Sequence, residues 1–303
     1  MEYSTAVNSA IYLLVFFFGL SVGSFLNVVI YRLPREGLSV SRPKRSFCPG
    51  CGADINWYDN IPVFSWIFLR ARCRACRRPI AFRYPLVELS AGLLSLYLFH
   101  RFGASTGYLL YFHRFEASAV YLLYFYFAMC LLAIALIDLE LMVIPTVLMY
   151  PTTALGLLCA VLAPDMALAG PALWAKLEPV WGPHLSSLAG SALGLLLGWG
   201  SLWLVSRAYK IVRGHEGMGD GDPPLLGMIG AFLGWRAVPL VILWSTLIGI
   251  FSVAILMLMA KGKPPEEGWG MKALPFGPFL VLAAFLYLFF GPAFMAWYWS
   301  LMS

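Results

Sequence analysis

The chain has 303 residues, of which 61% are hydrophobic and only 12% are charged, and its mean hydropathy is +0.79. A water-soluble domain cannot bury that much apolar surface, so the composition excludes soluble enzymes and predicts a polytopic membrane protein. The net charge of +6 is concentrated in one place, because 11 of the 21 Lys and Arg residues lie between Arg32 and Arg83. This basic stretch indicates a cytosolic loop beside a membrane, with anionic lipids rather than nucleic acid as its expected partner.

Eight apolar segments follow one another along the chain, and most are close to the roughly 20 residues that cross a bilayer. They occupy residues 11–31, 84–99, 118–137, 144–163, 187–205, 225–235, 238–260 and 280–298. The first ends in the basic loop without a small-residue cleavage site, so we expect it to stay in the protein as a helix. The sequence therefore predicts an all-α polytopic membrane protein with about eight transmembrane helices. We expect three parts: a first helix (1–31), a cytosolic four-cysteine domain (32–83) and a transmembrane core (84–303).

The distribution of positive charge predicts the orientation of these helices. Seventeen of the 21 Lys and Arg residues fall in three loops, 32–83, 206–222 and 261–275. Because cytosolic loops carry an excess of positive charge, we expect these loops in the cytosol and both termini on the other side. Two aspartates, Asp138 and Asp222, then lie at the cytosolic ends of their helices.

Four of the six cysteines form two CxxC pairs inside the basic loop, Cys48 with Cys51 and Cys73 with Cys76. Disulfides are not expected in the cytosol, and two such pairs together supply the four thiolates of a tetrahedral zinc site. All four positions around the metal would be filled by protein, so we expect the Zn²⁺ to be structural. Redox-active dithiols are the alternative that the spacing leaves open.

Two aspartates follow apolar stretches at matching depth in the predicted membrane. Asp138 follows twenty nearly uncharged residues, and Asp222 ends the sequence Gly219-Asp220-Gly221-Asp222. A carboxylate at the edge of a bilayer is costly, and two that lie close together share a proton. One can then activate water while the protonated one polarises a carbonyl, which is the chemistry of an aspartic protease. Asp220 and Glu140 are rival candidates, and snorkelling or helix capping is the structural alternative for each aspartate.

Several longer motifs give the chain a resemblance to a known family. In chain order they are residues 23–34 (GSFLNVVIYRLP), 57–63 (WYDNIPV), 83–88 (RYPLVE), 137–140 (IDLE), 219–222 (GDGD) and 274–280 (LPFGPFL). In this order they resemble the type IV prepilin leader peptidases, which are bifunctional peptidases and N-methyltransferases of bacterial pilus and type II secretion systems. The chain departs from the pattern of that family at Thr146, at Pro223-Pro224 and in a tandem repeat at 100–125.

The resemblance implies an aspartic endopeptidase of the bacterial inner membrane, with its active site at the cytosolic face and Asp138 and Asp222 as the catalytic pair. The substrate would be a prepilin or pseudopilin, whose basic leader is removed before an N-terminal Phe that is then methylated with S-adenosylmethionine. Asn27 and Glu88 are polar groups in apolar segments and are candidates for the methyl-donor site. Hydrogen bonding between helices is the structural alternative for both.

Two other functions stay open from the residues alone. The first is a non-enzymatic membrane scaffold whose cytosolic domain is stabilised by zinc. In such a scaffold the aspartates would only pack or orient helices. In an ion or metal transporter, Asp138 and Asp222 would be ligands inside the membrane. Transport predicts more polar groups deep in the apolar segments, and these segments are nearly free of them away from their cytosolic ends.

Overall fold

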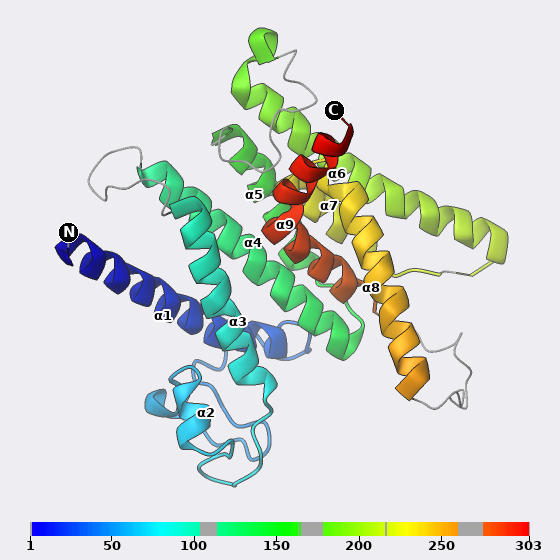
Figure 1. Ribbon diagram of the computed structural model, residues 1–303. Coiled ribbons are helices and arrows are strands. Elements are labelled where there is room, and N and C mark those ends of the chain that lie inside the picture. The colour runs from blue at the N-terminus through cyan, green and yellow to red at the C-terminus, as the bar shows by residue number, and fades with distance from the viewer. Residues whose placement is uncertain are drawn as a thin grey trace. The chain divides into compact units, whose positions relative to one another are not determined.

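The computed structural model of the chain (Figure 1) describes residues 2–103, 114–162, 164, 178–215, 217–259 and 275–302. In this part of the chain the regular elements are helical, which confirms the predicted all-α fold for these residues. They are α1 (Glu2–Arg32), α2 (Phe64–Phe68), α3 (Arg83–Leu98), α4 (Arg114–Leu141), α5 (Thr146–Leu162), α6 (Glu178–Arg213), α7 (Asp222–Leu233), α8 (Ala237–Met259) and α9 (Gly277–Met302), with a 3₁₀ turn η1 (Trp57–Asn60) and a π turn η2 (Phe99–Gly103).

Each of the eight apolar segments lies on a helix, but the predicted number of eight transmembrane helices is not confirmed. Five of the described helices, α1, α4, α6, α8 and α9, are long and apolar enough to cross a membrane. The helices α3, α5 and α7 have only 16, 17 and 12 residues. At about 1.5 Å per residue, α7 reaches only about 18 Å of a hydrocarbon core that is about 30 Å thick. The chain is therefore a multi-pass membrane protein in which a short helix such as α7 needs other helices around it.

The chain divides into two compact units, residues 1–129 and 130–303, and the boundary falls inside α4. The first unit contains α1, α3 and the four-cysteine domain. The second contains the end of α4, which carries Asp138, together with α5 to α9. These two units do not correspond to the three parts predicted from the sequence, 1–31, 32–83 and 84–303, whose boundaries stay a prediction. Because the two candidate sites lie in different units, each is described by itself.

In the first unit, α1 packs closely against α3. A Cβ atom added at Gly19 would lie 2.6 Å from the Cβ of Ser95, and one added at Gly23 would lie 2.7 Å from the Cα of Glu88. The hydroxyl of Ser95 donates to the carbonyl of Val15 (2.9 Å) and thus joins the two helices. Small residues let helices in lipid approach closely. Since α1 and α3 flank residues 33–82, their contact brings the two ends of the four-cysteine domain together.

In the second unit, α7 lies among α5, α6, α8 and α9 (Figure 1) and contacts all four. Most of its side chains are buried, which is the pattern of a core helix rather than of a helix with one lipid-facing side. The contact between α6 and α7 is made by glycines. A Cβ atom added at Gly194 or Gly230 would overlap the backbone of the other glycine, and one added at Gly198 would overlap the carbonyl group of Leu226.

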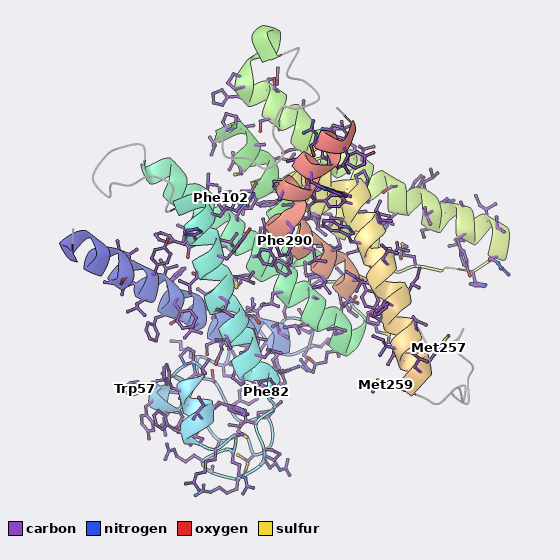
Figure 2. The ribbon with its side chains drawn as sticks, in the orientation of Figure 1. Trp57, Phe82, Phe102, Met257, Met259 and Phe290 are labelled. Atoms are coloured by element: carbon purple, nitrogen blue, oxygen red, sulfur yellow. The ribbon has the colours of Figure 1, made fainter. Side chains whose placement is uncertain are left out.

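The helix α8 shows where the second unit is expected to face lipid. Only 11% of its most apolar stretch is buried, and Phe251 and Leu258 are 69% and 79% exposed. Met257 and Met259 stand out from the end of the same helix in Figure 2. Apolar side chains exposed over a whole helix are tolerated where hydrocarbon covers them. This surface is therefore consistent with a membrane-embedded unit.

Several sequence predictions concern residues outside the described ranges. These include the middle of the tandem repeat at 100–125 and nearly all of the loop 261–275. Because the topology prediction depends partly on the basic residues of that last loop, the cytosolic placement of the three basic loops stays a prediction.

Candidate active site and metal centre

Two backbone turns of the same design hold the four cysteines. In the first, the N–H of Gly52 donates to the carbonyl of Cys48 (2.8 Å), and in the second the N–H of Arg77 donates to the carbonyl of Cys73 (3.0 Å). Gly52 and Arg77 have positive φ angles of 72° and 60°, so the chain turns back directly after the second cysteine of each pair. Glycine adopts this conformation freely, whereas arginine does so at some cost in free energy.

The sulfur atoms of the four cysteines come together at one point. All four Sγ atoms lie within 4.8 Å of one another, and those of Cys48 and Cys76 are 3.9 Å apart. Tetrahedral Zn²⁺ with Zn–S bonds of about 2.3 Å holds its sulfur atoms about 3.8 Å apart, so this donor set fits the metal. Hydrogen bonds from the backbone N–H groups of Cys76 and Ala75 lower the pKa of the Cys73 thiol to about 7, whereas the neighbouring thiols of Cys76 and Cys48 help to raise the pKa of the Cys51 thiol to about 11. The fit to a metal therefore rests on the positions of the four sulfur atoms. The predicted four-cysteine cluster is confirmed, and zinc as its occupant is taken up below as part of the proposed function.

Replacing Cys48 or Cys73 by Ser is expected to abolish zinc binding and to lower the thermal midpoint of the protein. Among residues 33–82 only Cys48 and Ser65 are buried, so this domain has little core to hold it together without a metal. Metal analysis of the purified chain should give about one zinc per wild-type chain and none for either variant. Cys159→Ser, which changes a buried thiol in α5, should keep the zinc. A stable wild-type protein that contains no metal would contradict the prediction.

Asp222 is the first residue of α7 and lies where the glycine-rich loop becomes a helix. Its carboxylate accepts a hydrogen bond from the backbone N–H of Gly219, and its own N–H donates to the carbonyl of Gly219 (3.2 Å). The two prolines that follow occupy the first turn of α7, where N–H groups have no partner within the helix. Pro223-Pro224 therefore begin the helix without removing a helical hydrogen bond.

Asp138 lies in the last turn of α4, and like Asp222 it is only 4% exposed. The helix ends soon after it, where Met142 adopts a positive φ of 54° and donates its N–H to the carbonyl of Asp138 (2.9 Å). The carboxylate of Asp138 accepts a hydrogen bond from the backbone N–H of Gly277, the first residue of α9. Asp138 is thus held by two segments that are far apart in the sequence.

The structure brings the carboxyl groups of Asp138 and Asp222 close enough to interact electrostatically. Ile144 lies between the glycine-rich loop before Asp222 and the start of α9, whose Gly277 is hydrogen-bonded to Asp138. A Cβ atom added at Gly221 would lie 2.6 Å from the Cβ of Ile144, and one added at Gly277 would lie 3.2 Å from its Cδ1. Asp138 Oδ2 and Asp222 Oδ1 are buried and have no hydrogen-bond partner among the described residues. Buried polar atoms are normally paired, so these two oxygens are where we expect water or a substrate group to bind.

The rival carboxylates differ from this pair in their exposure. Asp220 and Glu140 are both exposed, although each is only two residues from a member of the pair. Two carboxyl groups share a proton where they lie close together and away from water, and among these four only Asp138 and Asp222 are buried. Burial therefore favours Asp138 and Asp222 over their rivals, while the catalytic role of the pair stays a prediction.

The two candidates for a methyl-donor site are bonded to other groups of the first unit. The side-chain amide of Asn27 donates to the carbonyl of Tyr84 (3.1 Å). Glu88 accepts hydrogen bonds from the N–H of Val63 (2.7 Å) and from the hydroxyl of Ser24. These bonds join α1, α3 and the residue before α2, as the structural alternative for both residues predicts. A role of either residue in methyl transfer stays a prediction.

Gly277 and Ile144 belong to the candidate active site, although the sequence assigned neither a role. Gly277 falls inside the stretch 274–280 that contributes to the family resemblance, which is the one signal that could have found it. A backbone N–H donor has no signature of its own in a sequence. Ile144 is one apolar residue among many, and only its position between two glycines in the folded chain distinguishes it.

Gly277→Ala is expected to disturb Asp138 directly. The added Cβ would lie 2.5 Å from Asp138 Oδ2, closer than such atoms approach, so the carboxylate has to move. A displacement of about 1 Å at a reacting group costs about a hundredfold in rate. We therefore expect a loss of that order in any activity of the pair, with little change in thermal midpoint. In the control Gly249→Ala, the added atom meets Phe279 at an ordinary 3.4 Å, and activity should be kept. Full activity of Gly277→Ala would contradict the assigned contact.

Comparison with known proteins covers nearly the whole chain. The model of the bacterial peptidase A24 N-terminal domain matches residues 17–102, and the model of the type IV leader peptidase family matches residues 125–254. A prepilin leader peptidase/N-methyltransferase from Aeromonas hydrophila is 36% identical, over 94% of this chain and 92% of its own. Proteins with the same name from Pseudomonas putida and Pseudomonas aeruginosa are each 35% identical, over 90% and 96% of this chain and 88% and 94% of their own. No solved structure matches the chain.

Proposed function

Because the chain belongs to the type IV leader peptidase family, we propose that it cleaves the basic leader from a prepilin or pseudopilin and then methylates the new N-terminal Phe. Family membership makes the chain an enzyme with leader peptidase and N-methyltransferase activity. We further propose that the cleaved bond lies directly before a Phe residue and that this Phe is the residue that is methylated. The observation that carries the peptidase assignment is the buried pair of Asp138 and Asp222, with one unpartnered oxygen on each.

We assign the cleavage to the two carboxyl groups acting together. Two carboxyl groups this close do not both ionise readily, so they share one proton. The ionised group takes a proton from water, whose oxygen attacks the carbonyl carbon of the scissile peptide bond, while the protonated group donates to the carbonyl oxygen. A proton then passes to the leaving nitrogen as the C–N bond breaks. The N–H groups of Gly219 and Gly277 hold the two carboxylates in position.

The site is proposed to lie at the cytosolic face of the bacterial inner membrane. Asp138 is near the end of a helix long enough to span, and Asp222 begins an apolar helix, so both carboxyl groups lie at helix ends rather than in the middle of a span. The positive charge of the neighbouring loops supports a cytosolic placement. A substrate that joins a basic cytosolic leader to an apolar helix would present its scissile bond at this boundary.

Zinc and S-adenosylmethionine have different places in the proposal. The four thiolates fit a Zn²⁺ with no open coordination position, so the metal would hold residues 33–82 together and take no part in cleavage. S-adenosylmethionine supplies the methyl group for the amine that cleavage exposes. Asn27 and Glu88 stay the proposed candidates for binding it, beside the hydrogen bonds that they already make to Tyr84 and Val63.

The purified full-length chain, incubated with a full-length prepilin, tests this proposal through the intact mass of the product. We expect loss of the leader without S-adenosylmethionine, and loss of the leader plus gain of one methyl group with it. The same pilin supplied without its leader is the control and should show no cleavage. A folded, zinc-containing preparation that leaves the prepilin intact would refute the peptidase assignment, and leader loss without methylation would refute only the second activity.

The rival functions receive less support from the described residues. A transporter needs charged or strongly polar groups along a path through the membrane. Within the described part of the long helices, α6, α8 and α9 bury only serines among residues with polar or charged side chains other than tyrosine. The helices α1 and α4 also bury Asn27, Arg32 and Asp138, but these three lie within the last two turns of their helices and do not form a path through the membrane. A scaffold requires no buried pair of unpartnered carboxylate oxygens, which cost free energy unless a function uses them. Peptidase activity accounts for both observations.

A further inference from the structure

A pocket of about 550 Å³ lies on the four-cysteine domain, beside the second cysteine pair. Its walls come from η1, from α2 and from the chain that follows α2. Three arginines, Arg70, Arg74 and Arg77, line it together with the aromatic rings of Phe64 and Phe68. Neither the peptidase pair nor the candidates for methyl transfer belong to this pocket, so the proposed function leaves it without a role.

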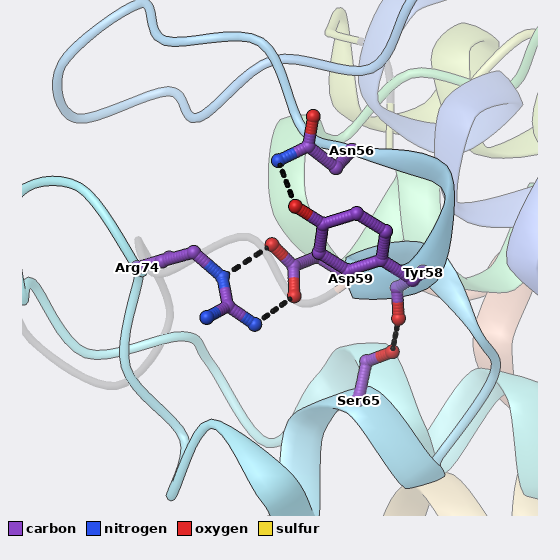
Figure 3. Close-up of polar contacts among 5 residues, drawn as sticks. All are labelled: Asn56, Tyr58, Asp59, Ser65 and Arg74. Carbon is purple, nitrogen blue, oxygen red and sulfur yellow. Dashed lines mark hydrogen bonds and ion pairs between the residues drawn. The ribbon is translucent and has the colours of Figure 1, made fainter.

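One wall of the pocket is held by a fixed ion pair (Figure 3). The guanidinium of Arg74 donates from Nε and Nη2 to the two carboxylate oxygens of Asp59, at 2.8 and 2.6 Å. The side chain of Asp59 is only 9% exposed, while that of Arg74 is 58% exposed, so the bidentate pair has a buried carboxylate and a guanidinium open to water on one side. The hydroxyl of Ser65 donates to the carbonyl of Tyr58 (2.9 Å) and joins η1 to α2. The wall is therefore preformed, and the one carboxylate of the pocket is already neutralised by Arg74.

The other two arginines provide positive charge that is not neutralised. Arg70 and Arg77 are exposed and make no side-chain hydrogen bond or ion pair within the described residues. Both have positive φ angles, of 52° and 60°, which arginine adopts at some cost. Two guanidinium groups at the edge of one pocket, with no acid left to balance them, favour a ligand with a negatively charged group such as a phosphate.

The aromatic rings of the pocket are also largely exposed to water. Phe68 is 82% exposed and Phe64 44%, and nearby in sequence Trp57 and Phe82 are 81% and 63% exposed. Trp57 and Phe82 lie on the surface of the four-cysteine domain in Figure 2. Water-exposed aromatic rings next to arginines are typical of the membrane–water interface. The domain is attached to α1 at one end and α3 at the other, so such an interface is within its reach.

We propose that this pocket binds the phosphate group of an anionic phospholipid, with Phe68 against the apolar part of the same molecule. Arg70 and Arg77 hold the phosphate, and the ion pair of Arg74 with Asp59 keeps the wall in place. A basic prepilin leader has the wrong charge for these arginines. S-adenosylmethionine carries a sulfonium and an ammonium group against one carboxylate, so it too has a net positive charge. An acidic lipid headgroup is complementary in charge and lies where the domain meets the membrane.

Thermal stability of the purified full-length chain tests the proposal without using its activity. The protein, in micelles of an uncharged detergent, is titrated with short-chain phosphatidylglycerol and in parallel with phosphatidylcholine of the same chain length. We expect phosphatidylglycerol to raise the thermal midpoint and phosphatidylcholine to leave it nearly unchanged. In Arg70→Asn/Arg77→Asn, asparagine suits the positive φ angles, and the apparent affinity for phosphatidylglycerol should fall about thirtyfold.

A matched control removes the same charge from the same domain. Lys44→Gln/Arg72→Gln changes two exposed basic residues outside the pocket and should keep the affinity of the wild-type chain. The proposal is overturned if both lipids raise the midpoint equally, if the pocket variant binds as tightly as wild type, or if the control loses as much as the pocket variant. It is also overturned if inorganic phosphate or S-adenosylmethionine alone produces the full effect at the same concentration. None of these outcomes bears on the peptidase assignment.

Discussion

Asp138→Asn and Asp222→Asn are each expected to slow leader cleavage by about 10²- to 10⁴-fold, because each removes one of the two groups that transfer a proton. Asparagine keeps an oxygen that can accept the N–H of Gly277 or Gly219, so the fold should survive. The initial rate of leader release, measured with a purified prepilin, checks this expectation. Zinc content and thermal midpoint of the same preparations show whether a loss of rate has a structural cause.

Asp220→Asn is the matched control for this prediction. Asp220 lies in the same glycine-rich loop, carries the same charge and is exposed, whereas Asp222 is 4% exposed. Because the cleavage step is assigned to the buried pair of Asp138 and Asp222, this variant should keep most of the wild-type rate. If Asp222→Asn cleaves as fast as wild type and Asp220→Asn does not, the catalytic role belongs to Asp220 and the assignment from burial is wrong.

Gly198→Ala is expected to destabilise the protein and to reduce cleavage, although it changes no polar group. The added Cβ would lie 2.8 Å from the carbonyl carbon of Leu226 and 3.1 Å from the Cα of Gly227, both in the backbone of α7. Backbone atoms cannot rotate away, so α7 itself has to shift. Overpacking of this kind costs about 1–3 kcal/mol. Since Leu226 is one helical turn from Asp222, the shift reaches the carboxylate and should lower the cleavage rate at least about tenfold.

Gly200→Ala makes the same substitution two residues further along α6 and should have the opposite effect on stability. A Cβ atom at Gly200 has nothing within 4 Å, and alanine is favoured over glycine inside a helix by up to about 1 kcal/mol. We expect a thermal midpoint at or above that of wild type and an unchanged cleavage rate. Equal behaviour of the two variants would mean that the close contact between α6 and α7 does not position Asp222.

The features that the sequence predicted correctly all depend on local chemistry. Runs of apolar residues predicted where the main helices lie, because the mean hydropathy of a segment depends only on its own residues. Two CxxC pairs identified the four-cysteine cluster, although their separation is slightly longer than is usual, since each pair forms a turn of its own. The glycines around Asp222 and the apolar stretch before Asp138 also singled out two aspartates that are buried in the structure, while their catalytic role stays a prediction. A charged side chain at the end of an apolar run is a strong signal, because placing it at the edge of a membrane costs free energy.

The features that the sequence could not supply depend on distant segments. Gly277 is 139 residues beyond Asp138 and contributes only a backbone N–H, so its role follows from packing. The close contact of α6 with α7 depends on glycines whose spacing is meaningful only when both helices are seen together. The pocket beside Arg70 and Arg77 forms because two chain turns bring these arginines near the rings of α2. No short pattern in the sequence encodes such arrangements.

The central claim is that Asp138 and Asp222 act as one unit on one peptide bond, and the double variant Asp138→Asn/Asp222→Asn tests it most directly. Its rate of leader release, with enzyme in excess over prepilin and long incubation, is compared with the rates of the two single variants. If the carboxyl groups work as a pair, removing either one already disables the shared step, so the double variant should fall to about the same residual rate as each single variant. A double variant whose loss is the product of two separate losses would show that the two groups act independently, and would contradict the account.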